Sequence, residues 1–287
     1  MVPHPLSALS RTLRRGDQTK IVLPPVIGHR GAAGYAPENT AAGFRKAAAL
    51  GCCWVEFDVR LTSDNQPVLL HDNRLERTTD GRGKVNARSF AAIRRHDAGS
   101  WLHPSFARER VPKLAEALAL LVELGLGGNI ELKAARGRAA ETGALVSSLL
   151  ASNWPDDPAR LLISSFQPVA LAAARDHAPR VPRGILFRRI PKNWFRIAAK
   201  LGCATIHADQ QRLSAAVVSD IRQAGYPLLA YTVNDRARAQ TLFDWGVTSV
   251  FSDVPDRLQG VAAGGGSCPV MVANRASAAA PRQEAIW

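Results

Sequence analysis

Residues 21–50 read IVLPPVIGHRGAAGYAPENTAAGFRKAAAL, and the order of residue types in this stretch predicts a strand, a loop and a helix. The apolar run at 21–27 is typical of a buried strand, and the alanine-rich run at 41–50 is typical of a helix. His29 and Arg30 stand between them, where the strand ends and a glycine-rich loop begins. Side chains at such a position point into open space, so the pair belongs either to a solvated turn or to a site.

The same alternation continues along the chain, as short apolar runs followed by longer stretches rich in Ala, Leu and Arg. Eight strand–helix pairs predict a (β/α)8 TIM barrel. A doubly wound sheet is the alternative, but its G-x-G-x-x-G turn is missing after the first strand. The expected strands are 26–29, 54–60, 128–133, 161–166, 183–187, 204–208, 228–233 and 249–252, and the expected helices are 38–50, 112–125, 138–152, 168–177, 193–201, 214–224, 235–245 and 255–262.

One interval, from 61 to 111, is much longer than a normal loop between a strand and a helix. It predicts a small insertion after the second strand, on the face of the barrel where active sites are built. We expect the barrel to span residues 21–262. The flanking segments 1–20 and 263–287 are predicted to be disordered extensions.

The composition bounds the possible partners. The chain has 287 residues and a net charge of +13, and its excess of arginine is spread along the sequence without interleaved aromatic residues. This pattern favours an anionic small-molecule substrate over nucleic acid. The chain has no apolar stretch of membrane-spanning length, and its first twenty residues lack the apolar core of a signal peptide, so we expect a cytoplasmic location. The sequence does not indicate the oligomeric state.

Carboxylates gather at two predicted strands. Glu56 and Asp58 stand two apart on the second strand, so they share one face, and Glu131 and Lys133 repeat this spacing on the third. Neighbouring strands of a barrel would bring the three carboxylates together. Oxygen ligands without cysteine favour a hard cation, Mg²⁺ or Ca²⁺, rather than zinc. The alternative is that Glu56 pairs with Lys133, or Asp58 with Arg30, as plain salt bridges.

Two histidines are expected at the same rim. His29 ends the first strand, and His71 closes an apolar run after the second. Such a pair can take and give a proton near neutral pH. Arg30 and Lys133 can hold phosphate oxygens. A cation, an acid, a base and an anion clamp together predict phosphoryl transfer or phosphodiester cleavage.

Other polar residues carry weaker predictions. Tyr231 and Asp253 face the same rim, where they shape the pocket, cap helices or fill the top layer of the barrel. His207 is expected to be a packed barrel histidine or a pocket residue. Asn39 and Thr40 are expected to serve the start of the first helix.

The chain resembles the glycerophosphodiester phosphodiesterases, most closely the bacterial cytoplasmic type. The resemblance runs from about residue 26 to residue 258 and rests on an ordered set of motifs. These are His29-Arg30-Gly31, Pro37-Glu38-Asn39-Thr40, Glu56-x-Asp58, His71-Asp72, Leu75-Glu76-Arg77-Thr78, Asp97-Ala98-Gly99-Ser100-Trp101, Glu131-x-Lys133, Ser165-Phe166, Tyr231-Thr232-Val233-Asn234 and Ser252-Asp253-Val254-Pro255.

The resemblance implies a (β/α)8 barrel that uses one divalent cation to hydrolyse glycerophosphodiesters, such as glycerophosphocholine and glycerophosphoethanolamine, to an alcohol and sn-glycerol 3-phosphate. By analogy with the phosphoinositide-specific phospholipases C, it also implies a cyclic phosphate intermediate. A lyase that stops at the cyclic phosphate and a barrel that only binds anionic phosphodiesters are the alternatives. Many relatives have Trp where Tyr231 stands. The resemblance implies that Glu56, Asp58 and Glu131 ligate the cation, that Arg30, Lys133 and Tyr231 contact the substrate, and that His29 and His71 are the base and the acid.

Overall fold

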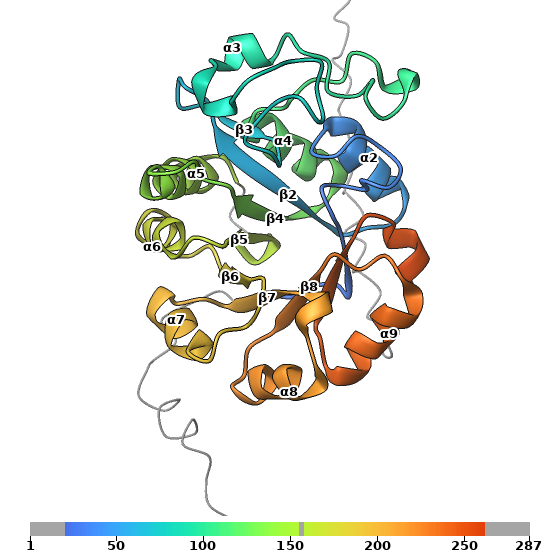
Figure 1. Cartoon of the computed structure of the whole chain (residues 1–287), viewed down its shortest axis with the longest axis vertical. Helices are drawn as coiled ribbons and strands as arrows, with labels where there is room; N and C mark the ends of the chain where they lie inside the picture. Colours follow the sequence, from blue (N-terminus) through green and yellow to red (C-terminus); the bar gives the residue numbers. More distant parts are fainter. Residues whose placement is uncertain (1–20, 155–157, 262–287) are drawn as a thin grey trace, which may run out of the picture.

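The computed structural model describes residues 21–154 and 158–261, which form a closed barrel of parallel strands surrounded by helices (Figure 1). Strand β1 hydrogen-bonds to β9 on one side and to β2 on the other, and this closes the barrel. The predicted (β/α)8 barrel is therefore confirmed, and the open doubly wound sheet is excluded. Within the described residues the barrel strands are β1 (Val26–Gly28), β2 (Trp54–Leu61), β4 (Gly127–Leu132), β5 (Leu161–Ser165), β6 (Arg183–Phe187), β7 (Thr205–Asp209), β8 (Leu228–Tyr231) and β9 (Ser249–Ser252).

The helices begin and end where the sequence supplies caps. The side chains of Thr40, Ser214 and Asp235 accept hydrogen bonds from the first turns of α2, α8 and α9. The predicted helix at 255–262 is instead a short 3-10 helix, η5 (Pro255–Leu258). The other predicted helices are found within three residues of their expected ends: α2 (Ala41–Ala49), α4 (Leu114–Leu124), α5 (Ala139–Asn153), α6 (Pro168–His177), α7 (Trp194–Leu201), α8 (Ala215–Gln223) and α9 (Arg236–Trp245).

The long interval after β2 folds as a cap with its own small core. The cap begins with a short strand, β3 (Pro67–Leu69), which pairs antiparallel with β2. The Leu70 amide donates to the Asp58 carbonyl oxygen (3.1 Å), so His71 lies next to the end of β2. The rest of the cap contains η1 (Val85–Ala87), α3 (Phe90–Ile93) and η2 (Pro104–Phe106), and its buried core consists of Val68, Leu70, Leu75, Val85, Ile93, Ala98 and Val111.

The barrel interior is apolar at the beginning of the strands and polar at their carboxyl ends. Along β2, alternate residues point inward, so Trp54 is followed on this face by Glu56 and then Asp58. The apolar layer packs around Trp54 with side chains from four other strands, whereas the outward-facing side chains pack against the helices. The members of this layer are Ile27, Trp54, Leu162, Leu229 and Phe251.

His207 is buried inside this barrel rather than exposed in a pocket. It is 0% exposed, its ring lies 5.4 Å from that of Phe251, and its Nε2 lies 2.9 Å from Thr205 Oγ1. Burial lowers its pKa to about 3, because no charged group compensates the lost hydration. His207 is therefore a neutral packing residue at physiological pH.

This burial predicts a pH-dependent stability. The unfolded chain protonates His207 below its ordinary pKa of 6.5, whereas the folded protein does not until the pH nears 3. The stability is therefore complete above pH 6.5 and is lost as the pH falls below it, by about 2 kcal/mol between pH 6.5 and pH 5. His207→Gln has no titrating ring at this position. We therefore expect its free energy of unfolding, measured in urea, to fall by about 2 kcal/mol less than that of the parent between pH 6.5 and pH 5. Parallel losses in both proteins would contradict the prediction.

Some expectations fall outside the described part of the chain. The predicted extensions at 1–20 and 263–287 lie in residues that the structure does not describe. Among the helices that it does describe, each is too short or too polar to cross a membrane.

Candidate active site

Three carboxylates meet inside the mouth of the barrel. Glu56 and Asp58 come from β2 and Glu131 from β4, where Asp58 and Glu131 are directly paired in register. All three are buried, and one oxygen from each lies within 4.8 Å of the others. The structure thus brings together the three residues expected to ligate a cation.

The electrostatics of this cluster fit a divalent cation. Burial raises the pKa of Glu56 well above its usual value, and Asp58 and Glu131 raise it further. Burial and Asp58 likewise raise the pKa of Glu131 to about 7. Glu56 Oε1 has no hydrogen-bond partner among the described residues. Because buried carboxylates without compensation are costly, an oxygen-liganded cation would relieve both the repulsion and the unpaired oxygen.

Two basic side chains compensate only part of this charge. Lys133 Nζ lies 2.8 Å from Glu131 and 3.4 Å from Asp58, and Arg30 Nε lies 3.5 Å from Asp58. Burial would raise the pKa of Asp58, but Lys133 and Arg30 outweigh it and hold that pKa at about 2. The predicted Asp58–Arg30 pair therefore exists, whereas the ion pairs found in the described chain do not include one between Glu56 and Lys133.

The loop after β1 holds Arg30 in a strained backbone conformation. Its φ is +51°, in the left-handed region that non-glycine residues seldom adopt. The Arg30 amide donates to Glu56 Oε2 (3.1 Å), and its Nη1 donates to Glu38 (2.9 Å). Next to it, a Cβ on Gly31 would lie 2.6 Å from the Gly43 backbone. The glycine thus lets the loop pack onto α2, and this packing aims Arg30 at the carboxylates.

His29 is oriented by an acid from the last strand. Its Nδ1 lies 2.7 Å from Asp253 Oδ1, and its Nε2 lies 3.8 Å from Glu56 Oε2. Burial would raise the pKa of Asp253, but its hydrogen bond with His29 outweighs this, so the pKa is lowered. An ionised Asp253 can only accept a hydrogen bond, so the His29 Nδ1–H donates to it. The other ring nitrogen, Nε2, then faces the carboxylate cluster.

His71 has the same arrangement on the other side of the mouth. Its Nδ1 lies 2.6 Å from Asp72 Oδ1, and Asp72 is held by Arg77 (2.7 Å). Burial lowers the pKa of His71, although Asp58 opposes the shift. Arg60 donates to the carbonyl oxygens of His71 (2.9 Å) and Lys133 (3.0 Å), so it fixes the cap to the end of β4.

Tyr231 contributes a ring rather than a free hydroxyl. Its hydroxyl donates to the Phe187 carbonyl oxygen (3.0 Å), and its ring meets that of Phe166 edge-on at 6.0 Å. Phe166 is 42% exposed, and its ring lies 5.8 Å from Lys133 Nζ. Together the two rings form an aromatic wall beside Lys133.

The sequence analysis misplaced one residue of this site. Thr40 caps α2 as expected, but Asn39 does not serve the helix. Its Nδ2 donates to Asp58 Oδ2 (2.9 Å), and its Oδ1 accepts from the Asp58 amide (3.0 Å). The positive φ of Asn39 (+58°) turns the side chain away from the helix start and toward β2. No pattern around Asn39 in the sequence indicates this pairing.

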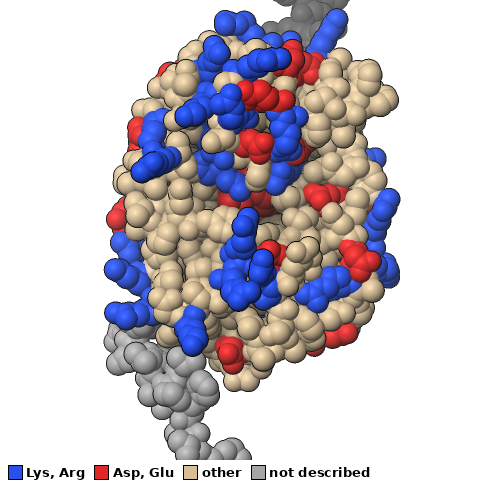
Figure 2. Space-filling view, in the orientation of Figure 1, with Lys and Arg blue, Asp and Glu red and all other residues tan. Residues whose placement is uncertain are grey.

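A second set of residues that the sequence did not predict links the two sides of the mouth. Glu38 accepts from both Arg30 (2.9 Å) and Arg77 (2.7 Å), and Arg77 in turn binds Asp72. In the sequence Glu38, Asp72 and Arg77 stand in motifs of the resemblance, but those motifs did not indicate that they pair with one another. Figure 2 shows acidic side chains near the centre of the viewed face, with basic side chains around them.

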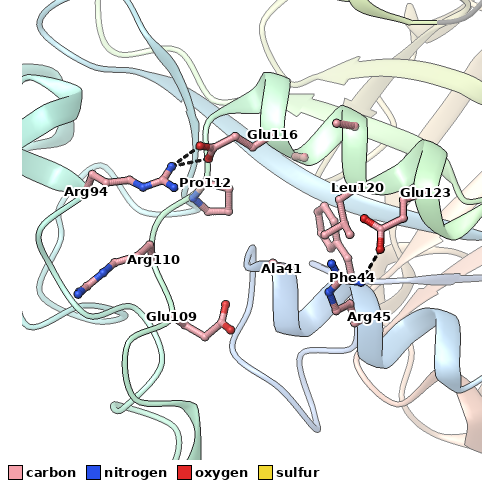
Figure 3. Close-up of a pocket in the computed structure, with 12 residues that line it drawn as sticks. Ala41, Phe44, Arg45, Arg94, Glu109, Arg110, Pro112, Glu116, Leu120 and Glu123 are labelled. Atoms are coloured by element: carbon pink, nitrogen blue, oxygen red, sulfur yellow. Dashed lines mark hydrogen bonds and ion pairs between the residues drawn. The ribbon is translucent and has the colours of Figure 1, made fainter. Parts of the chain in front are cut away.

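A hollow of about 460 Å³ lies elsewhere, between α2, α4 and the end of the cap (Figure 3). Phe44 and Leu120 lie between two ion pairs there, Arg45–Glu123 (2.8 Å) and Arg94–Glu116 (2.5 Å). None of the predicted site residues lines it. This hollow is therefore separate from the cluster of carboxylates and histidines at the barrel mouth.

Known proteins resemble this chain along most of its length. Residues 29–257 match the family model described as the glycerophosphoryl diester phosphodiesterase family. A glycerophosphodiester phosphodiesterase of Caldanaerobacter subterraneus is 30% identical, with 84% of this chain and 98% of that protein covered. One from Bacillus subtilis is 31% identical, with 80% and 83% covered.

A solved structure shares both the fold and much of the sequence. It is a phosphodiesterase of Oleispira antarctica in complex with the product sn-glycerol-3-phosphate. That protein is 42% identical to this chain and superposes with a TM-score of 0.81. The match covers 83% of this chain and 96% of the other.

Proposed function

The chain belongs to the glycerophosphoryl diester phosphodiesterase family, and we propose that it hydrolyses glycerophosphodiesters to an alcohol and sn-glycerol 3-phosphate with the help of one divalent cation. The observation that carries the proposal is the joint placement of the three carboxylates and two histidine–aspartate pairs at one barrel mouth. The product bound to the Oleispira antarctica protein supports the same chemistry.

In this proposal, Glu56, Asp58 and Glu131 hold the cation, either Mg²⁺ or Ca²⁺. When bound, a divalent cation neutralises charge that develops on phosphate oxygens. The uncompensated charge of the carboxylates and the unpaired Glu56 oxygen support this role for the three side chains.

Arg30 and Lys133 hold the non-bridging phosphate oxygens. Both are cations beside the carboxylates, and the half-buried Lys133 keeps its charge because Asp58 and Glu131 raise its pKa against the effect of burial. The aromatic wall of Phe166 and Tyr231 covers the carbon side of the substrate. The residues thus bind an anionic phosphate beside the carbon atoms of its ester groups.

His29 and His71 move the protons. Each has its Nδ1 against an aspartate, so each presents Nε2 to the reacting phosphate. We assign His29 as the base, which takes a proton from an attacking hydroxyl, and His71 as the acid, which gives one to the leaving alcohol oxygen. If the attacking group is a substrate hydroxyl, a cyclic phosphate forms first and water then opens it.

The proposal is tested by measuring glycerol 3-phosphate release from glycerophosphocholine and glycerophosphoethanolamine. The purified protein is assayed with Mg²⁺, with Ca²⁺ and with a chelator, using a coupled dehydrogenase. We expect release that depends on the cation. Folded protein that releases none under any condition would contradict the proposal.

Product analysis by phosphorus NMR separates hydrolysis from the lyase alternative. A hydrolase ends at glycerol 3-phosphate, whereas a lyase accumulates the cyclic phosphate. A protein that only binds phosphodiesters would form neither product. The cytoplasmic location and the absence of nucleic-acid binding remain predictions from the sequence.

A further inference from the structure

One buried amide beside the carboxylates has no role in the proposed function. Asn129 lies on β4, two residues before Glu131, so both side chains face the barrel interior. It is 1% exposed, and its Oδ1 has no hydrogen-bond partner among the described residues. Because a buried unpaired carbonyl oxygen is destabilising, its position calls for a partner that the protein chain does not supply.

The neighbours of Asn129 limit where that partner can lie. On β2, Glu56 is paired in register with Asn129, and Glu56 Oε1 likewise has no hydrogen-bond partner in the described part of the chain. On β5, the paired residue is Leu162, a member of the apolar layer. Below Asn129, the indole of Trp54 packs against Gly127, where an added Cβ would lie 2.4 Å from the ring. Polar groups in neighbouring register positions are Glu56, Glu131 and Ser164, which lies one register position beyond Leu162 on β5.

Glu56, Asp58, Asn129 and Glu131 therefore form two adjacent registered pairs on neighbouring strands. Strands of one sheet lie about 4.8 Å apart, so these four side chains border one small space. Among the described residues, three of their buried oxygens have no hydrogen-bond partner: Glu56 Oε1, Asn129 Oδ1 and Glu131 Oε1. Of these, Glu131 Oε1 lies 2.8 Å from Lys133 Nζ as an ion pair. An amide oxygen is a normal ligand type for Mg²⁺ and Ca²⁺ and adds no negative charge.

We propose that Asn129 is a fourth oxygen group of the cation site, alongside Glu56, Asp58 and Glu131. This inference rests on the cation proposed above. The neutral amide adds an oxygen without increasing the repulsion among three carboxylates. In the cation-free protein the same oxygen is a source of instability, so binding of the cation and folding are coupled through Asn129.

The test is a calorimetric titration of the folded protein with Mg²⁺ and with Ca²⁺, together with the melting temperature of the cation-free form. Asn129→Leu keeps a similar volume and removes the oxygen. We expect it to weaken cation binding by at least about 10-fold. Its cation-free melting temperature should stay equal or rise, because an unpaired polar group is replaced by an apolar one. Unchanged affinity in the folded variant would overturn the proposal.

A second variant keeps the proposal falsifiable if leucine prevents folding. Asn129→Asp retains an oxygen and adds a fourth carboxylate. We expect a lower cation-free melting temperature and a larger increase in melting temperature when the cation is added than in the parent. An aspartate variant that matches the parent in both would contradict the proposal.

Ser147 on α5 offers a matched control. Its hydroxyl is likewise buried and has no hydrogen-bond partner among the residues that the structure describes, but it lies on a helix outside the barrel. Ser147→Ala should leave cation affinity unchanged, and an equal loss in this control would overturn the specific role of Asn129. A parent protein that binds neither cation would overturn the cation site itself. If instead the parent binds the cation and only Asn129→Leu has no effect, the proposed function stands without Asn129.

Discussion

Replacing His29 by alanine is expected to reduce kcat about 10²- to 10⁴-fold, which is the usual contribution of a positioned acid or base. We expect a loss of the same order for His71→Ala. Each variant removes a proton carrier whose Nδ1 is already held by an aspartate, so the loss should appear in kcat more than in KM. The measurement is steady-state release of glycerol 3-phosphate at saturating cation.

His177→Ala is the control for this prediction. His177 is exposed at the end of α6, and helices of such a barrel run opposite to the strands, so it lies on the face away from the mouth. The His177→Ala variant should retain the kcat and KM of the parent. If His29→Ala and His71→Ala both matched His177→Ala, the assignment of proton transfer to these histidines would be wrong.

The second large effect is expected from Glu56→Gln. This change removes one carboxylate ligand. Mutating a residue that only orients a metal ligand typically costs roughly 10- to 100-fold in affinity, so losing a ligand should weaken cation affinity by about 100-fold or more. The cation-free protein should melt at the same or a higher temperature, because burial and its acidic neighbours already raise the pKa of Glu56. Calorimetric titration and thermal melting measure the two quantities separately.

Asp58→Asn provides the contrast. Asp58 is ionised among Lys133, Arg30 and Asn39, so its charge is compensated in the cation-free fold. Its neutralisation should lower both the cation affinity and the cation-free melting temperature. If Glu56→Gln and Asp58→Asn destabilised the cation-free protein equally, the described charge balance would be wrong.

The positions of the strands and helices were largely readable from the sequence. Apolar runs of strand length, separated by helical stretches, placed all eight barrel strands within two residues of their observed ends. The last helix was the exception, because Pro255 begins only a short 3-10 turn. The long interval after β2 was recognised as an insertion, but its pairing with β2 and its separate core depend on contacts that local patterns do not show.

The convergence of Glu56, Asp58 and Glu131 was also predictable. Side chains two apart on a strand share a face, and consecutive barrel strands are neighbours, so the topology alone brings these carboxylates together. Residue types and spacing therefore carried the expectation of a cation site. The side chains that hydrogen-bond to these carboxylates, such as Asn39, were not predictable from strand spacing and order.

What the sequence by itself determined is the barrel, the inward face of each strand and the set of chemical groups at the mouth, because these follow from local periodicity and chain order. Only the tertiary structure decided that Asn39 binds Asp58, that Asp253 orients His29, and that the Asn129 oxygen lacks a partner within residues 21–154 and 158–261. Each of these depends on where loops and strands distant in sequence come to lie. A hydrogen bond requires placement within a few tenths of an ångström, and this is set by the packing of the whole fold.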